Sequence, residues 1–330
     1  EQNQKKHPDF IANKKSLGLL HAMVGNLPDD YKWVARSFGG MSGTTEQGLK
    51  ELEEVLAYSK QHEFVFEDEA VVTYAFLQLY LNNKPALAWE TIKNSKLNPK
   101  TNPLANYAFA TVAMRSEHND EAIKMLQNFP GGSMYFDLNH RYYMLGVAKL
   151  RRLDSDANQS LEIFLQQYKG INGIKECYQK LAWYHLVQGN QNAYRQNIAL
   201  VRQAGASNSE PDKAALEEAK VNDAPDVRLI KARLLFDGGY YQRAYDLLKP
   251  AASDYQSDRK RLLEYTYRIG RITHKMNRSP EAIGYYRQTI DSGASEPWYF
   301  ACNAALQIGL IYEEKRDFQS ARNAFQRCLD

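Results

Sequence analysis

The sequence predicts an all-α protein in which antiparallel helix pairs stack side by side into a solenoid. Small residues recur at about one helix-pair interval, which is the pattern of a helical repeat array. Only 19 Gly and 11 Pro occur in 330 residues, and this low content favours helices over a turn-rich β fold. The chain is long for one compact core and suits an extended array.

The clearest repeat unit lies near the end of the sequence. Gly309 and Tyr312 belong to its first helix, Phe318 follows the turn, and Ala321 and Phe325 belong to its second helix. The residues equivalent to Gly309 are Phe76, Ala110, Gly146, Leu181, Ala232 and Gly270, at intervals of 34, 36, 35, 51, 38 and 39. About twelve residues further on, six units have Ala and one has Ser: Ala88, Ala122, Ser160, Ala193, Ala244, Ala282 and Ala321. Two antiparallel helices approach most closely where such small side chains face each other.

This pattern resembles the tetratricopeptide repeat, whose period is about 34 residues. The resemblance implies a right-handed α-α superhelix, with the first helix of each pair on the concave side and a partner protein or peptide bound in that groove. We expect an N-terminal helical cap in residues 1–62. An array of about seven helix pairs is expected in residues 63–330. The interval of 51 indicates a loop insertion at 204–225, within which Pro211 to Lys220 is expected to form an extra helix. We expect a hinge or subdomain boundary there.

The first 62 residues do not follow the repeat. Helices are expected at 14–25, 28–37 and 44–61, with a glycine-rich turn at 39–43. The order of Gly18, Leu27-Pro28, Phe38-Gly39 and Gly48-Leu49 faintly resembles a tetratricopeptide family associated with the mitochondrial outer membrane and with inclusion-body clearance. That resemblance implies a scaffold near a membrane, with peripheral association.

Several classes of function are disfavoured by the composition. The net charge of +3 lacks the basic excess of a nucleic-acid binder. No apolar run is long enough for a transmembrane helix. The seven His and three Cys show no metal-ligand spacing, and no catalytic motif occurs. We therefore expect no enzyme activity, cofactor or metal. The sequence does not determine the cellular compartment. If a leader preceded Glu1, the protein is exported and is periplasmic or membrane-associated; otherwise it is cytoplasmic.

Tyrosine recurs on the first helices at the groove position that the repeat frame defines. Tyr107, Tyr143, Tyr178 and Tyr267 occupy this position in four of the seven units. Tyrosine is common in protein interfaces because it gives a large contact area and a hydrogen bond. The alternative is that these rings pack between neighbouring helix pairs.

A second group of candidate groove residues is mostly basic. Its members are His185, Arg233, Arg268, Arg271, His274 and Lys275. An acidic peptide or a terminal carboxylate suits such a surface, whereas the alternative is a solvated basic face. The function expected from the sequence is therefore a scaffold that binds a protein or peptide. Small-molecule or glycan binding in the aromatic groove is the alternative.

Overall fold

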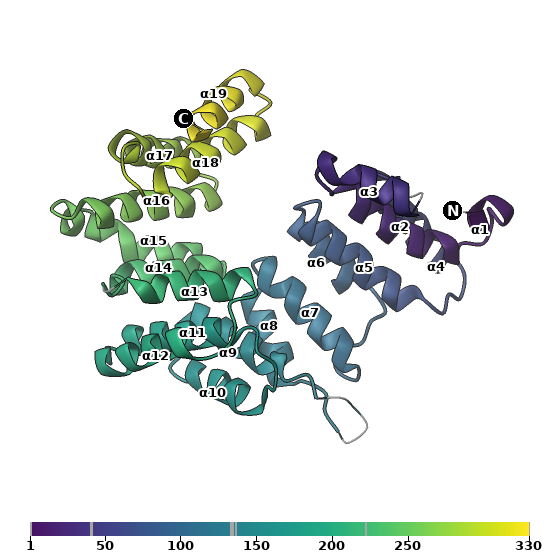
Figure 1. Ribbon diagram of the computed structural model, residues 1–330, viewed down its shortest axis with the longest axis horizontal. Coiled ribbons are helices and arrows are strands. Elements are labelled where there is room, and N and C mark those ends of the chain that lie inside the picture. The colour runs from purple at the N-terminus through teal and green to yellow at the C-terminus, as the bar shows by residue number, and fades with distance from the viewer. Residues whose placement is uncertain (1, 40–41, 133–134, 136, 222, 330) are drawn as a thin grey trace. The chain divides into compact units, whose positions relative to one another are not determined.

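The computed structural model describes residues 2–39, 42–132, 135, 137–221 and 223–329, and every regular element in these ranges is a helix (Figure 1). The expected all-α class is therefore confirmed. The chain divides into two compact units, Glu1–Arg141 and Tyr142–Asp330. This division falls within the expected array of 63–330, not at residue 62 or inside the 204–225 insertion.

The described residues of the first unit form eight helices. They are α1 (Gln2–Lys6), α2 (Ala12–Gly25), α3 (Asp29–Gly39), α4 (Thr45–Ser59), α5 (Glu67–Tyr80), α6 (Pro85–Lys93), α7 (Pro103–Arg115) and α8 (Asn119–Gln127). The three helices expected at 14–25, 28–37 and 44–61 are present as α2, α3 and α4, each shifted by two residues or fewer at either end. The expected glycine turn at 39–43 lies partly outside the described residues.

Helices α2 and α4 pack with almost no space between their backbones. A Cβ atom added at Gly18 would lie 2.8 Å from the carbonyl oxygen of Gly48. A Cβ atom added at Gly48 would lie 2.5 Å from the backbone nitrogen of Ala22 and closer still to the Gly18 carbonyl oxygen. Thr44 begins α4, because its hydroxyl accepts a hydrogen bond from the Gln47 amide at 3.0 Å. Only glycine fits at this crossing.

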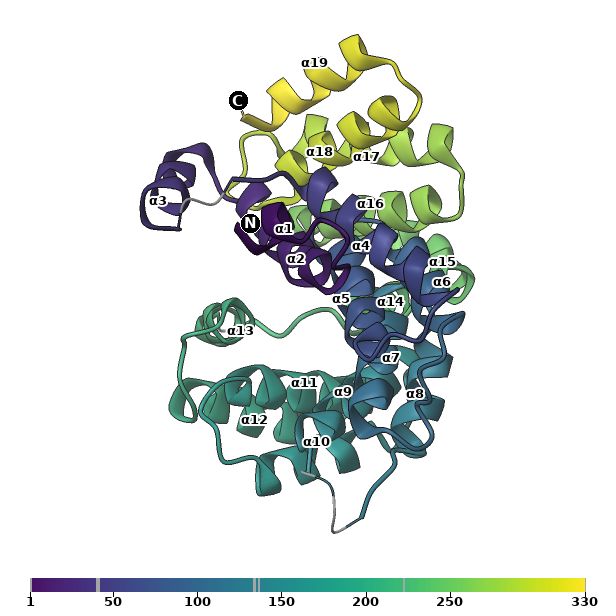
Figure 2. The same cartoon turned by 90° about the vertical axis from the view of Figure 1, so that its right-hand side faces the viewer.

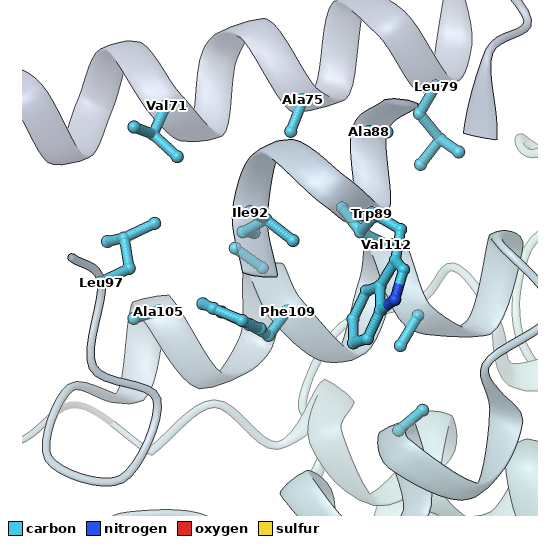
Figure 3. Close-up of a cluster of buried hydrophobic side chains, with 13 residues drawn as sticks. Val71, Ala75, Leu79, Ala88, Trp89, Ile92, Leu97, Ala105, Phe109 and Val112 are labelled. Atoms are coloured by element: carbon cyan, nitrogen blue, oxygen red, sulfur yellow. The ribbon is translucent and has the colours of Figure 1, made fainter. Parts of the chain in front are cut away.

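The pairs α5–α6 and α7–α8 share one apolar core (Figure 3). Ile92 of α6 is fully buried, and Trp89 of the same helix packs in the same cluster. Ala75 of α5 and Ala113 of α7 are also fully buried and let these helices approach α6. Neither pair could bury this apolar surface alone, so the two pairs stabilise each other.

The described residues of the second unit form α-helices and one 3₁₀ helix. They are α9 (His140–Arg152), which begins two residues before the boundary, α10 (Ala157–Gln167), α11 (Ile174–Val187), α12 (Gln191–Gln203), α13 (Glu210–Lys220), α14 (Val227–Asp237), α15 (Tyr241–Leu248), η1 (Lys249–Tyr255), α16 (Arg259–Lys275), α17 (Ser279–Gly293), α18 (Phe300–Glu314) and α19 (Phe318–Leu329). Five helix pairs follow one another here: α9–α10, α11–α12, α14–α15, α16–α17 and α18–α19. With α5–α6 and α7–α8, the described residues hold seven such pairs.

Small residues lie at the helix crossings, as the repeat frame required. A Cβ atom at Gly270 would lie 2.9 Å from the ring of Tyr286 on the partner helix, and one at Gly309 would overlap the ring of Phe325. Ala244 and Ala282 are fully buried within their helix pairs. In these pairs a small residue on one helix makes room for an apolar group of the other.

The insertion folds as the extra helix α13, which packs against α11 and α12 (Figure 2). Ala215 and Ala219 of α13 are fully buried in a cluster with Tyr194 and Ile198 of α12. The Ser209 hydroxyl accepts a hydrogen bond from the Asp212 amide at 3.3 Å and begins the helix. The expected helix is confirmed, but the insertion is part of the second unit and is not a hinge between the two units.

Candidate functional site

A cleft of about 230 Å³ opens in the second unit between α14 and α16. It is lined by Ala232, Arg233, Phe236, Asp237, Tyr267, Arg268, Arg271, Ile272 and Tyr299. The two helices are the first helices of consecutive pairs, and Tyr299 precedes the first helix of the next pair. The cleft therefore combines three arginines and two aromatic rings on neighbouring first helices with the ring of Tyr299.

The helices that form this cleft are fixed at their N-termini by aspartate caps. The Asp226 carboxylate accepts from the amides of Arg228 and Leu229 at 2.9 Å, which begins α14. The Asp258 carboxylate accepts from the Arg261 amide at 3.0 Å, which begins α16. Such caps satisfy amides that have no partner within the helix.

Aromatic packing holds one wall of the cleft in place. Tyr267 is buried, and its ring centroid lies 5.8 Å from that of Phe300 and 6.1 Å from that of Tyr299. Tyr299 itself is 55% exposed and meets Tyr267 edge to face. A buried ring thus supports a ring that remains partly exposed at the cleft.

Arg271 is held in a defined orientation at the cleft. Its guanidinium carbon lies 4.8 Å from the centroid of the Phe236 ring, and one of its nitrogens donates a hydrogen bond to the Tyr267 hydroxyl at 3.1 Å. Among the described residues, no carboxylate lies within 4 Å of this guanidinium. An arginine has five donor hydrogens, so most of the donors of Arg271 are available to groups other than protein carboxylates.

The other two arginines of the cleft have acidic neighbours. Arg268 donates to the Glu264 carboxylate at 2.7 Å through Nε. The Arg233 Nε lies 3.9 Å from the nearer Asp237 oxygen. These two guanidinium charges are matched within the protein, one closely and the other loosely. Arg271 therefore provides the unmatched positive charge of the cleft.

Next to the cleft, two cations contact the ring of Trp183 of α11. Lys180 Nζ is 4.1 Å and the Arg233 guanidinium carbon 4.7 Å from the Trp183 ring centroid. The indole Nε1 donates to the Glu218 carboxylate of α13 at 2.6 Å, and that carboxylate also accepts from Gln179 at 2.7 Å. Trp183 thus connects the inserted helix with the arginine at the edge of the cleft.

Burial lowers the pKa of the Lys180 amine to about 8, although the nearby Glu176 carboxylate, 3.6 Å from Nζ, partly opposes the shift. The ordinary value is 10.5. Between pH 8 and 10.5 the unfolded chain therefore binds more protons at Lys180 than the folded protein does. Stability contributed by this group rises with pH in that window.

We expect the difference in unfolding free energy between wild type and Lys180→Met to move by about 2 kcal/mol in favour of wild type from pH 7 to pH 10. Tyrosines that titrate near pH 10 are present in both proteins, so their effect cancels in the difference. Urea unfolding of both proteins at a series of pH values measures this difference in unfolding free energy. A difference that stays flat across this range would show that the amine is not desolvated.

Of the ten residues proposed from the sequence, the cleft brings together Arg233, Tyr267, Arg268 and Arg271. Tyr143 instead packs against Phe164 of its own helix pair, with ring centroids 5.5 Å apart. Burial is the main cause that raises its pKa.

Tyr178 packs against the cluster that contains the buried alanines of α13. Tyr143 and Tyr178 therefore lie outside the cleft.

The remaining proposed residues lie outside the cleft. His185 meets Tyr184 edge to face at 5.1 Å, His274 meets Tyr286 at 6.3 Å, and burial lowers the pKa of both imidazoles. Lys275 is exposed at the end of α16. In the first unit, the Tyr107 hydroxyl is 2.9 Å from the His140 ring nitrogen.

Three lining residues were missed by the sequence argument. Phe236 and Asp237 occupy groove positions of the repeat frame, so the same frame that selected Arg233 could have identified them. Tyr299 lies before the first helix of its pair and outside that frame. Only the folded chain reveals its place over Tyr267.

In the part of the chain that the structure describes, His, Cys, Asp and Glu side chains do not gather into a group of three suited to a metal ion. In the same ranges, no helix has the length and apolar character needed to cross a membrane.

No known sequence family and no curated protein matches the chain. Among solved structures, the chain is similar to one in the structure of Naa15/Naa10 bound to HypK-THB, with 17% sequence identity and a TM-score of 0.33. The similarity covers 92% of this chain and 41% of that chain, so this chain spans less than half of the other's length.

Proposed function

We propose that this protein is a non-catalytic interaction scaffold that binds a peptide segment of a partner protein in the cleft between α14 and α16. The observation that supports the proposal is the arrangement of arginine and aromatic side chains on consecutive first helices. Arginine and tyrosine contribute most often to the binding energy of protein interfaces.

The size and openness of the site favour a peptide over a small ligand. The cleft volume of about 230 Å³ is smaller than the roughly 300–1,000 Å³ of typical small-molecule pockets. Such a volume suits one or two side chains of a longer chain. The rest of a bound segment would lie along the neighbouring first helices.

The test is selection from a displayed library of random dodecapeptides, followed by fluorescence-anisotropy titration of the selected peptides. Tyr299→Ala is expected to weaken binding by about tenfold or more, the size of an interface hot spot. Because Tyr299 is 55% exposed, the melting temperature should change by less than about 2 °C.

Tyr31→Ala is the matched control, since Tyr31 is similarly exposed at 62% but belongs to the first unit. It should leave peptide affinity unchanged. If no peptide is selected, or if the selected peptides bind Tyr299→Ala as tightly as wild type, the proposed site is refuted.

A further inference from the structure

The electrostatics of the cleft identify the chemistry of the segment that it takes. Three arginines line the cleft together with one aspartate, Asp237, and Glu264 neutralises Arg268 from the side. The positive charge of Arg271 is therefore the one that the described residues leave without a nearby carboxylate. A half-buried charge without a counter-charge is costly, and a ligand that supplies the counter-charge is favoured.

We propose that Arg271 binds the carboxylate of an acidic side chain within the peptide segment, and that an apolar residue next to it contacts Phe236 and Tyr299; this inference rests on the proposed function above. The Arg271 guanidinium is already oriented by the Phe236 ring and the Tyr267 hydroxyl. Little side-chain entropy is lost when a guanidinium group that is already oriented binds a carboxylate.

A single negative charge fits this cleft better than a phosphate does. Asp237 lines the cleft, and Glu264 lies beside it on Arg268. A phosphorylated residue carries about two negative charges and would be repelled by these carboxylates. One carboxylate balances the one unmatched guanidinium.

The position of the cleft favours a side chain over a chain terminus. Helix α14 packs against α11, and α16 packs against α18, so first helices continue on both sides of the cleft. A segment that lies along these helices passes through the cleft. It then presents a side chain, not its end, to Arg271.

The experiment uses nonapeptide arrays that are acetylated and amidated, with random flanks and the central residue fixed as Glu, Gln or phosphoserine. Wild type is expected to retain Glu peptides about tenfold more strongly than Gln peptides, the effect of a charge-assisted hydrogen bond. Arg271→Gln should reduce this discrimination to about twofold or less. Arg271→Lys should give an intermediate value, because lysine keeps the positive charge but lacks the paired donors of the guanidinium group.

Two further variants separate binding from folding. Asp237→Asn removes a carboxylate from the cleft and should strengthen Glu-peptide binding by about two- to threefold, a gain that misfolding cannot produce. Arg322→Gln removes an exposed basic group on α19, outside the cleft, and should change nothing.

The outcomes distinguish this inference from the proposed function. If no peptide is retained, the scaffold function itself fails. If peptides are retained without preference for Glu, or with equal preference in Arg271→Gln, the role of Arg271 is wrong while the scaffold function stands. Preference for phosphoserine over Glu would also overturn the inference.

Discussion

Gly48→Ala is expected to destabilise the α2–α4 pair by about 3 kcal/mol, near the upper end of overpacking costs. The new methyl group would meet backbone atoms of Gly18 and Ala22, which cannot rotate away as a side chain does. The two helices must therefore separate or shift along each other, and the buried Leu52 would lose its contacts.

Hydrogen exchange measured by mass spectrometry tests this locally. Peptides from α2 and α4 should exchange about 100-fold faster in Gly48→Ala, because 3 kcal/mol of local stability corresponds to about two orders of magnitude. Peptides from α16 to α19 in the second unit should be unaffected. Unchanged protection in α2 would mean that the close backbone contact is absent.

Gly284→Ala is the matched control, with an effect of the opposite sign. Gly284 lies inside α17, is exposed, and has no atom within 4 Å of the position of an added Cβ. Alanine there should stabilise the helix by about 0.5–1 kcal/mol, because glycine loses more backbone entropy on folding. The same substitution thus has opposite effects at a helix crossing and on a helix surface.

Asp212→Ala is expected to lower the free energy of unfolding by about 3 kcal/mol, because two amides lose their hydrogen-bond acceptor. The fully buried Asp212 carboxylate accepts from the Gly173 amide at 2.7 Å and from the Glu176 amide at 3.1 Å, so it caps α11 from the inserted helix. The Ser209 hydroxyl donates to the same carboxylate at 2.6 Å.

Urea unfolding and limited proteolysis at 204–225 measure the effect of Asp212→Ala. Asp212→Asn keeps one side-chain oxygen and should lose roughly half as much stability. Lys213→Ala, next in sequence, removes only a surface ion pair with Glu210 and should stay within about 0.5 kcal/mol of wild type. If Asp212→Ala matches Lys213→Ala, the cap contributes nothing to stability.

The fold could be predicted from the sequence because its determinant is local and periodic. Gly270, Ala282 and Gly309 recur at fixed places, and each place corresponds to a helix crossing that the structure contains. A crossing tolerates only small side chains, so the residue type carries the geometry. The extra helix in the insertion was predicted from a different local signal, because Pro211 to Lys220 is a short helical pattern that follows a loop.

The candidate site was only partly predictable, because a groove position does not determine what a side chain contacts. Tyr178 and Tyr267 occupy the same repeat position, yet Tyr178 packs against the cluster that includes α13 and Tyr267 lines the cleft. This difference arises from α13, an element outside the repeat. Tyr299, which contacts Tyr267, lies before the first helix of its pair and outside the repeat frame, so the frame gives no information about this contact.

The way in which α13 is attached limits how this chain can be shortened. Excising the inserted helix would restore nearly even spacing of the pairs in sequence, but it would uncover Tyr194, Ile198 and Val201 of α12 and remove the acceptor from the start of α11. A designer who wants a regular array must therefore replace those three side chains with polar ones and supply a new cap before Ile174. The insertion has become a structural requirement of its neighbours.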